Sequence, residues 1–273
     1  MSPGGAASHP PPLVLFELLR VPPARVGAAL VRMATDRRRL AGTAGLRFWK
    51  LLGTGDGRTF DVRDADPRTW AVLTVWDDDE AAQAYRLGSP VAVGWRRLAA
   101  EAWTAELEPI AAHGRWSGRE PFGPAAAPTS GQGGGSEHAS PRPREGPVAA
   151  ITRARLDPRR ARTFWRAVPP VTAALANADG VRLAVGIGEA PVGLQGTFSL
   201  WARERDLVAF AYRDPAHVAA VEATPRVGWY REELFARFRV RDATGTFCGH
   251  DPLGADRAEV GRTTVRQDQD RRT

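Results

Sequence analysis

The sequence carries one pattern twice, and this internal repeat limits the folds that the chain can adopt. Two tryptophans recur at intervals that differ by a single residue, and short motifs around them recur in the same order. Such spacing indicates two copies of one supersecondary unit. The matched segments are Gly53-Thr54-Gly55-Asp56 with Gly186-Ile187-Gly188-Glu189, Trp76 with Trp201, Tyr85-Arg86 with Tyr212-Arg213, and Trp103 with Trp229.

Each copy has the residue pattern of a βαββαβ unit. Short apolar runs rich in β-branched and aromatic residues predict the strands. Apolar residues at three- and four-residue intervals predict the helices between them, the last one in the second copy being broken. The strands are expected at 13–20, 46–53, 69–76 and 103–110 in the first copy, and at 147–156, 181–188, 196–201 and 232–240 in the second.

This order of elements predicts an α+β fold. A βαββαβ unit forms an antiparallel sheet with both helices on one face, which leaves the other, apolar face in need of cover. Two units can cover each other, so we predict two tandem ferredoxin-like repeats packed as an internal dimeric α/β barrel. The repeats are placed at 12–122 and 147–241, and the segments 1–11, 123–146 and 242–273 are predicted to be a disordered tail, a flexible linker and a disordered charged tail.

Composition excludes several classes of protein. The single cysteine, Cys248, rules out a disulfide framework and a thiolate zinc site, and it favours a reducing cytoplasm. The chain begins without a secretory signal pattern and has no apolar run long enough to span a bilayer, so we expect a cytoplasmic protein with at most peripheral membrane contact. The net charge of +7 comes from arginine, because Lys50 is the only lysine. The base-stacking signature of RNA-binding modules is missing, and no nucleic-acid partner is expected.

Elimination leaves one histidine as a candidate catalytic or ligand-binding residue. The sequence has no nucleophile elbow and no pair of histidines at metal-binding spacing, and three of its five histidines lie in the predicted tails and linker. His217 follows Asp214-Pro215, a good helix start, and counting from the helix cap or from the later tryptophan matches it to Ala92 or Val91 in the first copy. One unduplicated histidine on a helix that faces an aromatic-rich sheet suits a haem, which needs one axial imidazole and an apolar slot. The local sequence by itself favours a histidine that packs against its own helix.

Several segments resemble the spheroidene monooxygenase family of carotenoid-modifying enzymes. The most specific are "GIGEAPVGLQGTFSLW" and "GWY-x-EELFARF", supported by "FWKLLGTGDG", "TWAVLTVW", "GRWSGREPF" and "TFWRAVPP". The resemblance covers about 13–122 and 147–240. It implies a fold like that of the dimeric α/β barrel monooxygenases and a haem-dependent enzyme of carotenoid biosynthesis. Such an enzyme inserts oxygen from O₂ into the terminal region of a linear carotenoid and gives a hydroxy or keto product.

The resemblance also implies roles for individual residues. His217 would bind the haem iron, and an external electron donor, for instance of the ferredoxin type, would supply two electrons. Arg213, or an arginine of the helix at 153–166, would pair with a haem propionate. Pro225 is expected to end the helix of His217 near Thr224. The candidates for lining the slot are Phe198, Trp201, Tyr212, Trp229 and Tyr230.

Two other functions fit the same residues. In a cofactor-free monooxygenase of this fold, the substrate itself reduces O₂ and His217 is only a general base. In a non-catalytic binder, the protein holds a hydrophobic ligand without changing it. The expected partner in every case is a hydrophobic small molecule, which is a carotenoid or another polyene, a terpenoid or an aromatic polyketide.

Overall fold

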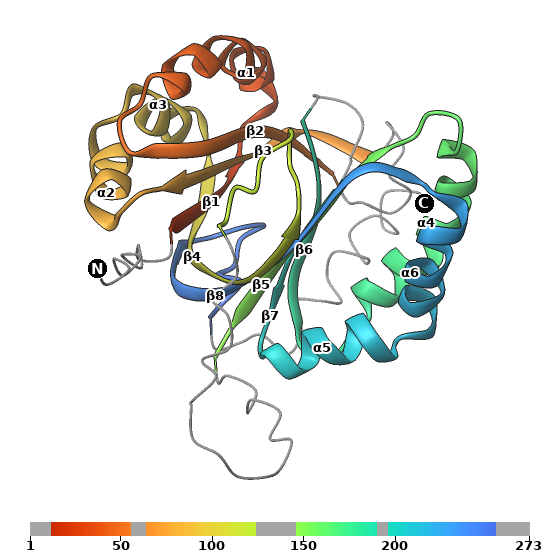
Figure 1. Cartoon of the computed structure of the whole chain (residues 1–273). Helices are drawn as coiled ribbons and strands as arrows, with labels where there is room; N and C mark the ends of the chain where they lie inside the picture. Colours follow the sequence, from red (N-terminus) through yellow and green to blue (C-terminus); the bar gives the residue numbers. More distant parts are fainter. Residues whose placement is uncertain (1–11, 56–63, 124–145, 190–195, 255–273) are drawn as a thin grey trace, which may run out of the picture.

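Eight antiparallel strands close into a barrel in the part of the chain that the computed structural model describes, residues 12–55, 64–123, 146–189 and 196–254 (Figure 1). The strand order around the barrel is β1-β3-β2-β6-β7-β5-β8-β4. The strands are β1 (Leu13–Arg20), β2 (Leu46–Gly55), β3 (Ala65–Trp76), β4 (Glu101–Gly114), β5 (Val148–Leu156), β6 (Val181–Gly188), β7 (Gly196–Trp201) and β8 (Tyr230–Gly245). The helices are α1 (Val26–Ala41), α2 (Asp79–Gly88), α3 (Pro90–Leu98), α4 (Ala161–Ala176), α5 (Glu204–Arg213) and α6 (Pro215–Val227).

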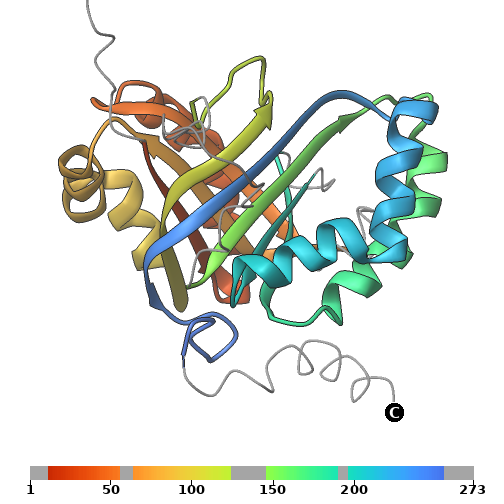
Figure 2. The same ribbon diagram turned by 60° about the horizontal axis from the view of Figure 1, so that its bottom comes forward.

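The barrel consists of two equal halves, as the repeat predicts. The first half has the sheet order β4-β1-β3-β2, and the second has the same order in β8-β5-β7-β6. Helices α1 to α3 lie outside the first sheet, and α4 to α6 lie outside the second (Figures 1 and 2). This arrangement confirms the predicted α+β fold of two ferredoxin-like repeats packed as an internal α/β barrel.

The two halves meet at two unequal seams. Strands β4 and β8 pair along their length, from Trp103–Gly114 to Leu234–Gly245. Among the described residues, strands β2 and β6 pair through Gly53–Gly55 and Gly186–Gly188. The two glycine motifs that mark the repeat in the sequence are therefore hydrogen-bonded to each other, at the point where the barrel closes.

The interior of the barrel is filled with apolar side chains from every strand. Phe16 of β1 stacks on Phe198 of β7 with ring centroids 3.8 Å apart, and Trp103 packs edge-on against Phe198. All three side chains are fully buried. Because side chains alternate between the two faces of a strand, the outer face of each sheet is left to the helices.

Strand pairing corrects two of the residue matches between the repeats. Trp76 and Trp201 are equivalent, because they pair with the first residues of β1 and β5. Trp103 is equivalent to Leu234 and not to Trp229. Trp103 pairs with Leu18 of β1, and Leu234 pairs with Arg153, the matching residue of β5. Tyr85 likewise corresponds to Phe210 and not to Tyr212, because each packs on its own tryptophan, Trp76 or Trp201. Matching like residues failed because it ignored which face of an element each one occupies.

Two predicted boundaries were also wrong. The second repeat does not end at residue 241, because β8 runs to Gly245 and Phe247 and Leu253 pack on the barrel core. The helix of His217 passes Pro225 and ends at Val227, where Gly228 adopts a left-handed conformation and donates its N–H to Thr224. A proline in the last turn removes one backbone hydrogen bond, because proline has no N–H, and leaves the helical turn itself intact. The predicted tail 1–11, nearly all of the linker and the C-terminal segment after 254 lie outside the described residues.

No helix among the described residues is long and apolar enough to cross a membrane.

A carboxylate lies beneath the helices of the first repeat. The Glu17 side chain, on the outer face of β1, is buried. Burial raises its pKa to about 7, although the charges of Arg96 and Arg86 oppose the shift. A folded-state pKa above the unfolded value stabilises the protein at low pH, and this contribution is lost as the pH rises through the folded pKa.

The Glu17→Gln substitution should therefore remove the part of the pH dependence of stability that comes from this carboxylate. The wild-type free energy of unfolding should contain a contribution of about 3 kcal/mol that disappears between about pH 5 and about pH 8. Urea unfolding at these two pH values measures it, with Glu80→Gln, an exposed residue of α2, as the control. Equal pH dependence in wild type and Glu17→Gln would contradict the assignment.

Candidate functional site

His217 lies in the first turn of α6 and is held by two local hydrogen bonds. The Asp214 carboxylate caps the helix and accepts the His217 backbone N–H at 2.9 Å. The ring Nδ1 lies 2.9 Å from the carbonyl oxygen of Ala211. Because a carbonyl only accepts, this contact places the proton of the neutral ring on Nδ1. Nε2 then carries the lone pair, and within the described part of the chain no hydrogen bond occupies it.

The surroundings of His217 favour the neutral form of its ring. Burial lowers its pKa below the ordinary value, and it outweighs the hydrogen bond to Ala211 and the charge of Asp214, which both raise the pKa. A neutral imidazole with an oriented Nδ1–H and a free Nε2 is the form that binds a metal or accepts a proton. The geometry therefore gives His217 a chemical capability that a purely structural histidine does not need.

A row of aromatic rings connects His217 with the second sheet. The Phe210 ring lies 4.9 Å from the His217 ring and 5.4 Å from that of Trp201, measured between centroids. Trp201 is fully buried at the end of β7, and its indole N–H donates to Ser199 at 2.9 Å. His217 thus lies beside the outer face of this sheet, on the side of the helices.

On that outer face, several positions hold small side chains where the first repeat has large ones. The strand registers make Leu15 equivalent to Ala150, and Trp49 equivalent to Ala184. Trp76 and Trp201 keep a large ring at one end of both sheets, but five outer-face positions further along the strands carry a smaller or more polar side chain in the second repeat. The pairs are Leu15 and Ala150, Leu19 and Ala154, Trp49 and Ala184, Leu51 and Gly186, and Val72 and Thr197.

The helices of the second repeat do not fill the space that these substitutions create. Helix α6 contributes no buried residue, whereas its counterpart α3 buries four. Thr152 and Ala184, in the middle of the second sheet, are exposed although they face the helix layer. Among the described residues, three form the buried cluster between this sheet and its helices, with five partly buried residues packed against them, whereas the matching cluster of the first repeat is much larger. We call the outer surface of β5 to β7 around Ala150, Thr152, Ala184, Gly186 and Thr197 the open face.

The structure brings some of the predicted site residues together and separates others. Trp201 lies with His217 on the open-face side. Trp229 and Tyr230 pack against Phe164 of α4 at the start of β8, and burial raises the pKa of Tyr230 to about 12. They flank the same helix layer at its other end.

Three predicted residues lie elsewhere. Phe198 was placed with His217, but it points into the barrel interior, because it alternates with Ser199 and Trp201 along β7. Tyr212 is 73% exposed on the outer side of α5. Arg213 is exposed at the end of α5, just before the Asp214 cap.

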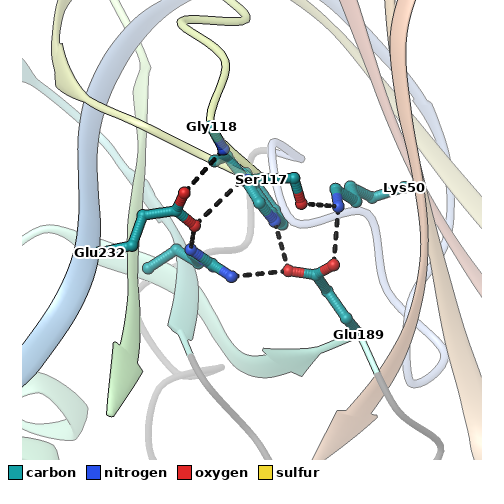
Figure 3. Close-up of polar contacts among 7 residues, drawn as sticks. Lys50, Ser117, Gly118, Glu189 and Glu232 are labelled. Carbon is teal, nitrogen blue, oxygen red and sulfur yellow. Dashed lines mark hydrogen bonds and ion pairs between the residues drawn. The ribbon is translucent and has the colours of Figure 1, made fainter. Parts of the chain in front are cut away.

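A second polar cluster lies at the short seam between the repeats (Figure 3). The Glu189 carboxylate accepts hydrogen bonds from Lys50 at 2.6 Å, from the Trp116 indole at 2.7 Å and from Arg153 at 2.8 Å. The Glu232 carboxylate accepts the backbone N–H groups of Ser117 and Gly118 and pairs with Arg153. Two cations match two anions, so the cluster is electrically balanced.

This cluster extends the closure of the barrel where backbone pairing is short. Lys50 and Trp116 belong to the first repeat, and Arg153, Glu189 and Glu232 belong to the second. The Arg153 side chain is only 4% exposed and takes the place of Leu18 in the first repeat. Burial opposes ionisation of both carboxylates, yet their hydrogen bonds lower both pKa values. Sequence patterns did not predict this cluster, although an alignment of the two repeats shows a charge where the other copy has leucine.

Neither cluster is a ready metal site made of protein ligands alone. Within the described ranges, no group of three or more His, Cys, Asp or Glu residues could hold a metal ion. His217 could supply one ligand to a metal that a cofactor brings with it.

The fold and the histidine define a class of protein, a single-chain α/β barrel of two ferredoxin-like repeats with one candidate ligand-binding side chain in the second. The crystal structure of the aldoxime dehydratase OxdRE in complex with butyraldoxime shares the fold, with a TM-score of 0.54, 14% identity, and coverage of 92% of this chain and 87% of that one. Another aldoxime dehydratase has a TM-score of 0.50, 14% identity, and coverage of 89% of each chain. These identities show the fold alone.

Sequence relatives identify the family. The spheroidene monooxygenase of Rhodobacter capsulatus is 35% identical over 224 residues, covering 82% of this chain and 88% of that protein. The spheroidene monooxygenase of Rubrivivax gelatinosus is 35% identical over 208 residues, covering 76% of this chain and 74% of that protein. A search for matching family models found none. The chain belongs to the spheroidene monooxygenase family, which confirms the resemblance in its motifs, and these relatives support a monooxygenase activity.

Removing the central cation of the seam cluster should destabilise the barrel strongly. Arg153→Leu introduces the residue of the first repeat but leaves the Glu189 and Glu232 carboxylates without their shared partner. We expect a loss of about 3–5 kcal/mol in the free energy of unfolding at neutral pH, because breaking a buried pair leaves uncompensated charge. Urea unfolding measures the loss, and Arg155→Leu, an exposed arginine on the same strand, is the control.

The same measurement at low pH provides a second check. A lowered carboxylate pKa stabilises the fold above the unfolded pKa, and the contribution is lost as the pH falls through the folded value. The difference between wild type and Arg153→Leu should therefore shrink on acidification. A difference that stays constant from neutral to acid pH would show that lost packing, and not charge, dominates.

Proposed function

We propose that this chain is a haem-dependent monooxygenase that oxidises the terminal region of a linear carotenoid or a similar long hydrophobic molecule. The observation that carries the proposal is the pairing of an oriented, neutral His217 with the open face of the second sheet. The relatives named spheroidene monooxygenase support the reaction and the substrate class.

The residues present fit a haem. A haem needs one imidazole with a free nitrogen, and His217 offers Nε2 while Ala211 holds Nδ1. It needs room for a flat apolar ring, and the open face has alanine and glycine where the first repeat has tryptophan and leucine. Arginines at the edge of the helix layer, Arg213 among them, are suited to the propionates.

When bound, haem would supply the activation of O₂, with two electrons from an external donor of the ferredoxin type. Each insertion would consume one O₂, two electrons and two protons; one oxygen atom enters a C–H bond of the substrate and the other leaves as water. A second insertion at the same carbon, with a second O₂ and two more electrons and protons from the same sources, would give a geminal diol, which loses water to form a ketone. The overall product is a hydroxy or keto carotenoid.

The protein residues around the site have separate tasks in this scheme. Ala211 fixes the His217 ring and its tautomer, and Asp214 fixes the helix turn that carries it. Phe210 and Trp201 make an apolar wall next to the ring, which keeps the imidazole neutral. Thr152 and Thr197 are the polar side chains on the open face, and they can donate or accept hydrogen bonds there.

The neutral His217 also favours a second candidate function. A free Nε2 on a ring with a lowered pKa can accept a proton from a substrate, as a cofactor-free monooxygenase requires. The two functions differ in whether the purified protein carries a chromophore.

The decisive test is the visible spectrum of the protein after addition of haem. Wild type should bind haem and show an intense Soret band, and His217→Ala should lose or shift that band and lose oxidation of carotenoid. His113→Ala, a histidine that stacks on Phe235 on the barrel seam, is the matched control and should behave as wild type. A colourless protein that still oxidises substrate would support the cofactor-free function, and a colourless, inert one would leave only ligand binding.

The open face can be tested separately by restoring the side chain of the first repeat. Ala184→Trp places an indole where Trp49 stands in the other half, on an exposed position that can accept it. We expect haem binding to fall by at least about tenfold while the far-UV circular dichroism and the unfolding midpoint are retained. Unchanged haem affinity in this variant would remove the open face from the proposed site.

A further inference from the structure

Two threonines lie side by side in the middle of the open face. Thr152 of β5 pairs directly with Thr197 of β7, and these two strands are neighbours in the second sheet (Figure 1). Both side chains point outward, because the residues next to them, Ile151 and Phe198, belong to the core of the barrel. Opposite residues on one face have Cβ atoms about 5 Å apart, so a single atom of a ligand can contact both hydroxyl groups.

The fold does not use these two hydroxyl groups. Within the described ranges, neither Thr152 nor Thr197 makes a side-chain hydrogen bond, and Thr152 is exposed. The next hydroxyl along β7, that of Ser199, accepts the indole N–H of Trp201 at 2.9 Å. Its counterpart in the first repeat, Thr74, accepts an indole N–H in the same way. The hydroxyl groups that the two repeats share therefore serve packing, whereas those of Thr152 and Thr197 are available to a ligand.

The first repeat has no pair of this kind. The equivalent residues are Glu17 and Val72, which also lie directly opposite each other. Both are buried beneath the helices of that repeat. The hydroxyl pair is thus a property of the second repeat, the half that carries His217.

A ligand that covers the pair must offer it a hydrogen-bonding partner. Across the strands, the neighbours of the pair are Phe235 on one side and Gly186 on the other. Along the same face of β5, Ala150 and Ala154 flank Thr152. None of these side chains has a polar atom, so a ligand of hydrocarbon alone would take two hydroxyl groups out of water without replacing their hydrogen bonds. The pair therefore selects a ligand with a hydrogen-bonding atom at this point.

The surrounding charges favour a neutral oxygen atom over a carboxylate. Two arginines lie on β8, the strand beside β5, and both have acidic partners. The Arg237 guanidinium lies 3.5 Å from the Glu204 carboxylate. The Arg239 guanidinium lies 3.2 Å from the Glu108 carboxylate. A carboxylate held by two threonines would lose hydration without a charge to offset that loss, whereas a hydroxyl, ether or carbonyl oxygen needs only hydrogen bonds.

We propose that the Thr152–Thr197 pair is a subsite for a neutral oxygen atom on the substrate chain, and that it holds the alcohol formed in the first insertion. This inference rests on the proposed function, because it takes the open face as the substrate site. An alcohol can accept a hydrogen bond from one threonine and donate one to the other. An alcohol held in this way keeps the same carbon in place for the second insertion, whereas an alcohol that dissociates is the hydroxy product. The pair therefore determines whether the alcohol or the ketone is released.

Polyene binding tests the recognition of oxygen without turnover. The probes are retinol, which has a terminal hydroxyl group, and axerophtene, the hydrocarbon that lacks only this group. The amount that the full chain retains on gel filtration is measured over a range of polyene concentrations. Wild type should bind retinol at least about tenfold more tightly than axerophtene, because the alcohol forms hydrogen bonds that the hydrocarbon cannot form.

Removal of the two hydroxyl groups should abolish this preference. The double variant Thr152→Val/Thr197→Val should bind retinol and axerophtene equally, since valine keeps the shape of threonine and lacks its hydroxyl. Thr244→Val, at an exposed position near the end of β8, is the matched control and should keep the wild-type preference. Valine suits a β-strand, and circular dichroism checks the fold of each variant. The two single variants extend the test if the double variant is unstable.

The ratio of products tests the retention of the alcohol. With carotenoid, O₂ and an electron donor, the double variant should raise the ratio of hydroxy to keto product by at least about fivefold, because the alcohol dissociates sooner. Its Soret band after addition of haem should match that of wild type. An unchanged product ratio would overturn the retention of the alcohol.

The binding results separate this inference from the proposed function. A wild-type protein without a Soret band contradicts haem dependence, and the preference for retinol then still decides whether the pair recognises oxygen. Equal binding of the two polyenes by wild type overturns the subsite, and so does an unchanged preference in the double variant. A double variant that loses haem affinity and keeps the preference for retinol assigns the hydroxyl groups to haem, which also overturns the proposal.

Discussion

Backbone pairing between the last strands of the two repeats is the interaction on which the rest of the structure depends. The β4–β8 ladder joins residues that are far apart in the sequence and turns two open sheets into one barrel. Each sheet has an apolar face that cannot remain in water, and closure buries both faces in a single core. In the described part of the chain, the opposite seam has three residue pairs between β2 and β6, and the buried Arg153, with Glu189 and Glu232, continues it through side chains. The barrel is thus closed by hydrogen bonds along one seam and partly by charge along the other.

Because closure buries the inner faces of both sheets, the side chains on the outer faces can differ between the two repeats. In the first repeat, large side chains such as Leu15 and Trp49 fill the space beneath the helices, and even Glu17 is buried there. In the second repeat, the corresponding positions hold small side chains, and α6 buries nothing. The first repeat therefore stabilises the fold through dense packing under its helices, whereas the second repeat has less packing around His217. Side chains removed from one copy of a duplicated unit leave room for a ligand without a change in the backbone.

The site could be predicted in part from the sequence, and the errors have a common cause. His217 stood out because the first copy has no histidine at that place, and Trp201 was correctly matched to Trp76. Phe198 and Tyr212 were expected to line the slot, but Phe198 lies in the barrel interior and Tyr212 is exposed on α5. A shift of one residue along a strand reverses the face of every side chain. The register that decides the face is fixed by pairing with distant strands, some of which contain bulges.

The sequence by itself determined the duplicated unit, the order of its strands and helices, and the one histidine that breaks the symmetry. These properties are local, because they follow from hydrophobic period, turn residues and helix caps. Only the tertiary structure decided which side chains share a face, that Arg153 lies in a buried ion cluster, and that the second sheet is open where the first is filled. Those properties depend on contacts between segments distant in the sequence. The free energy of such contacts cannot be assigned before the barrel is closed.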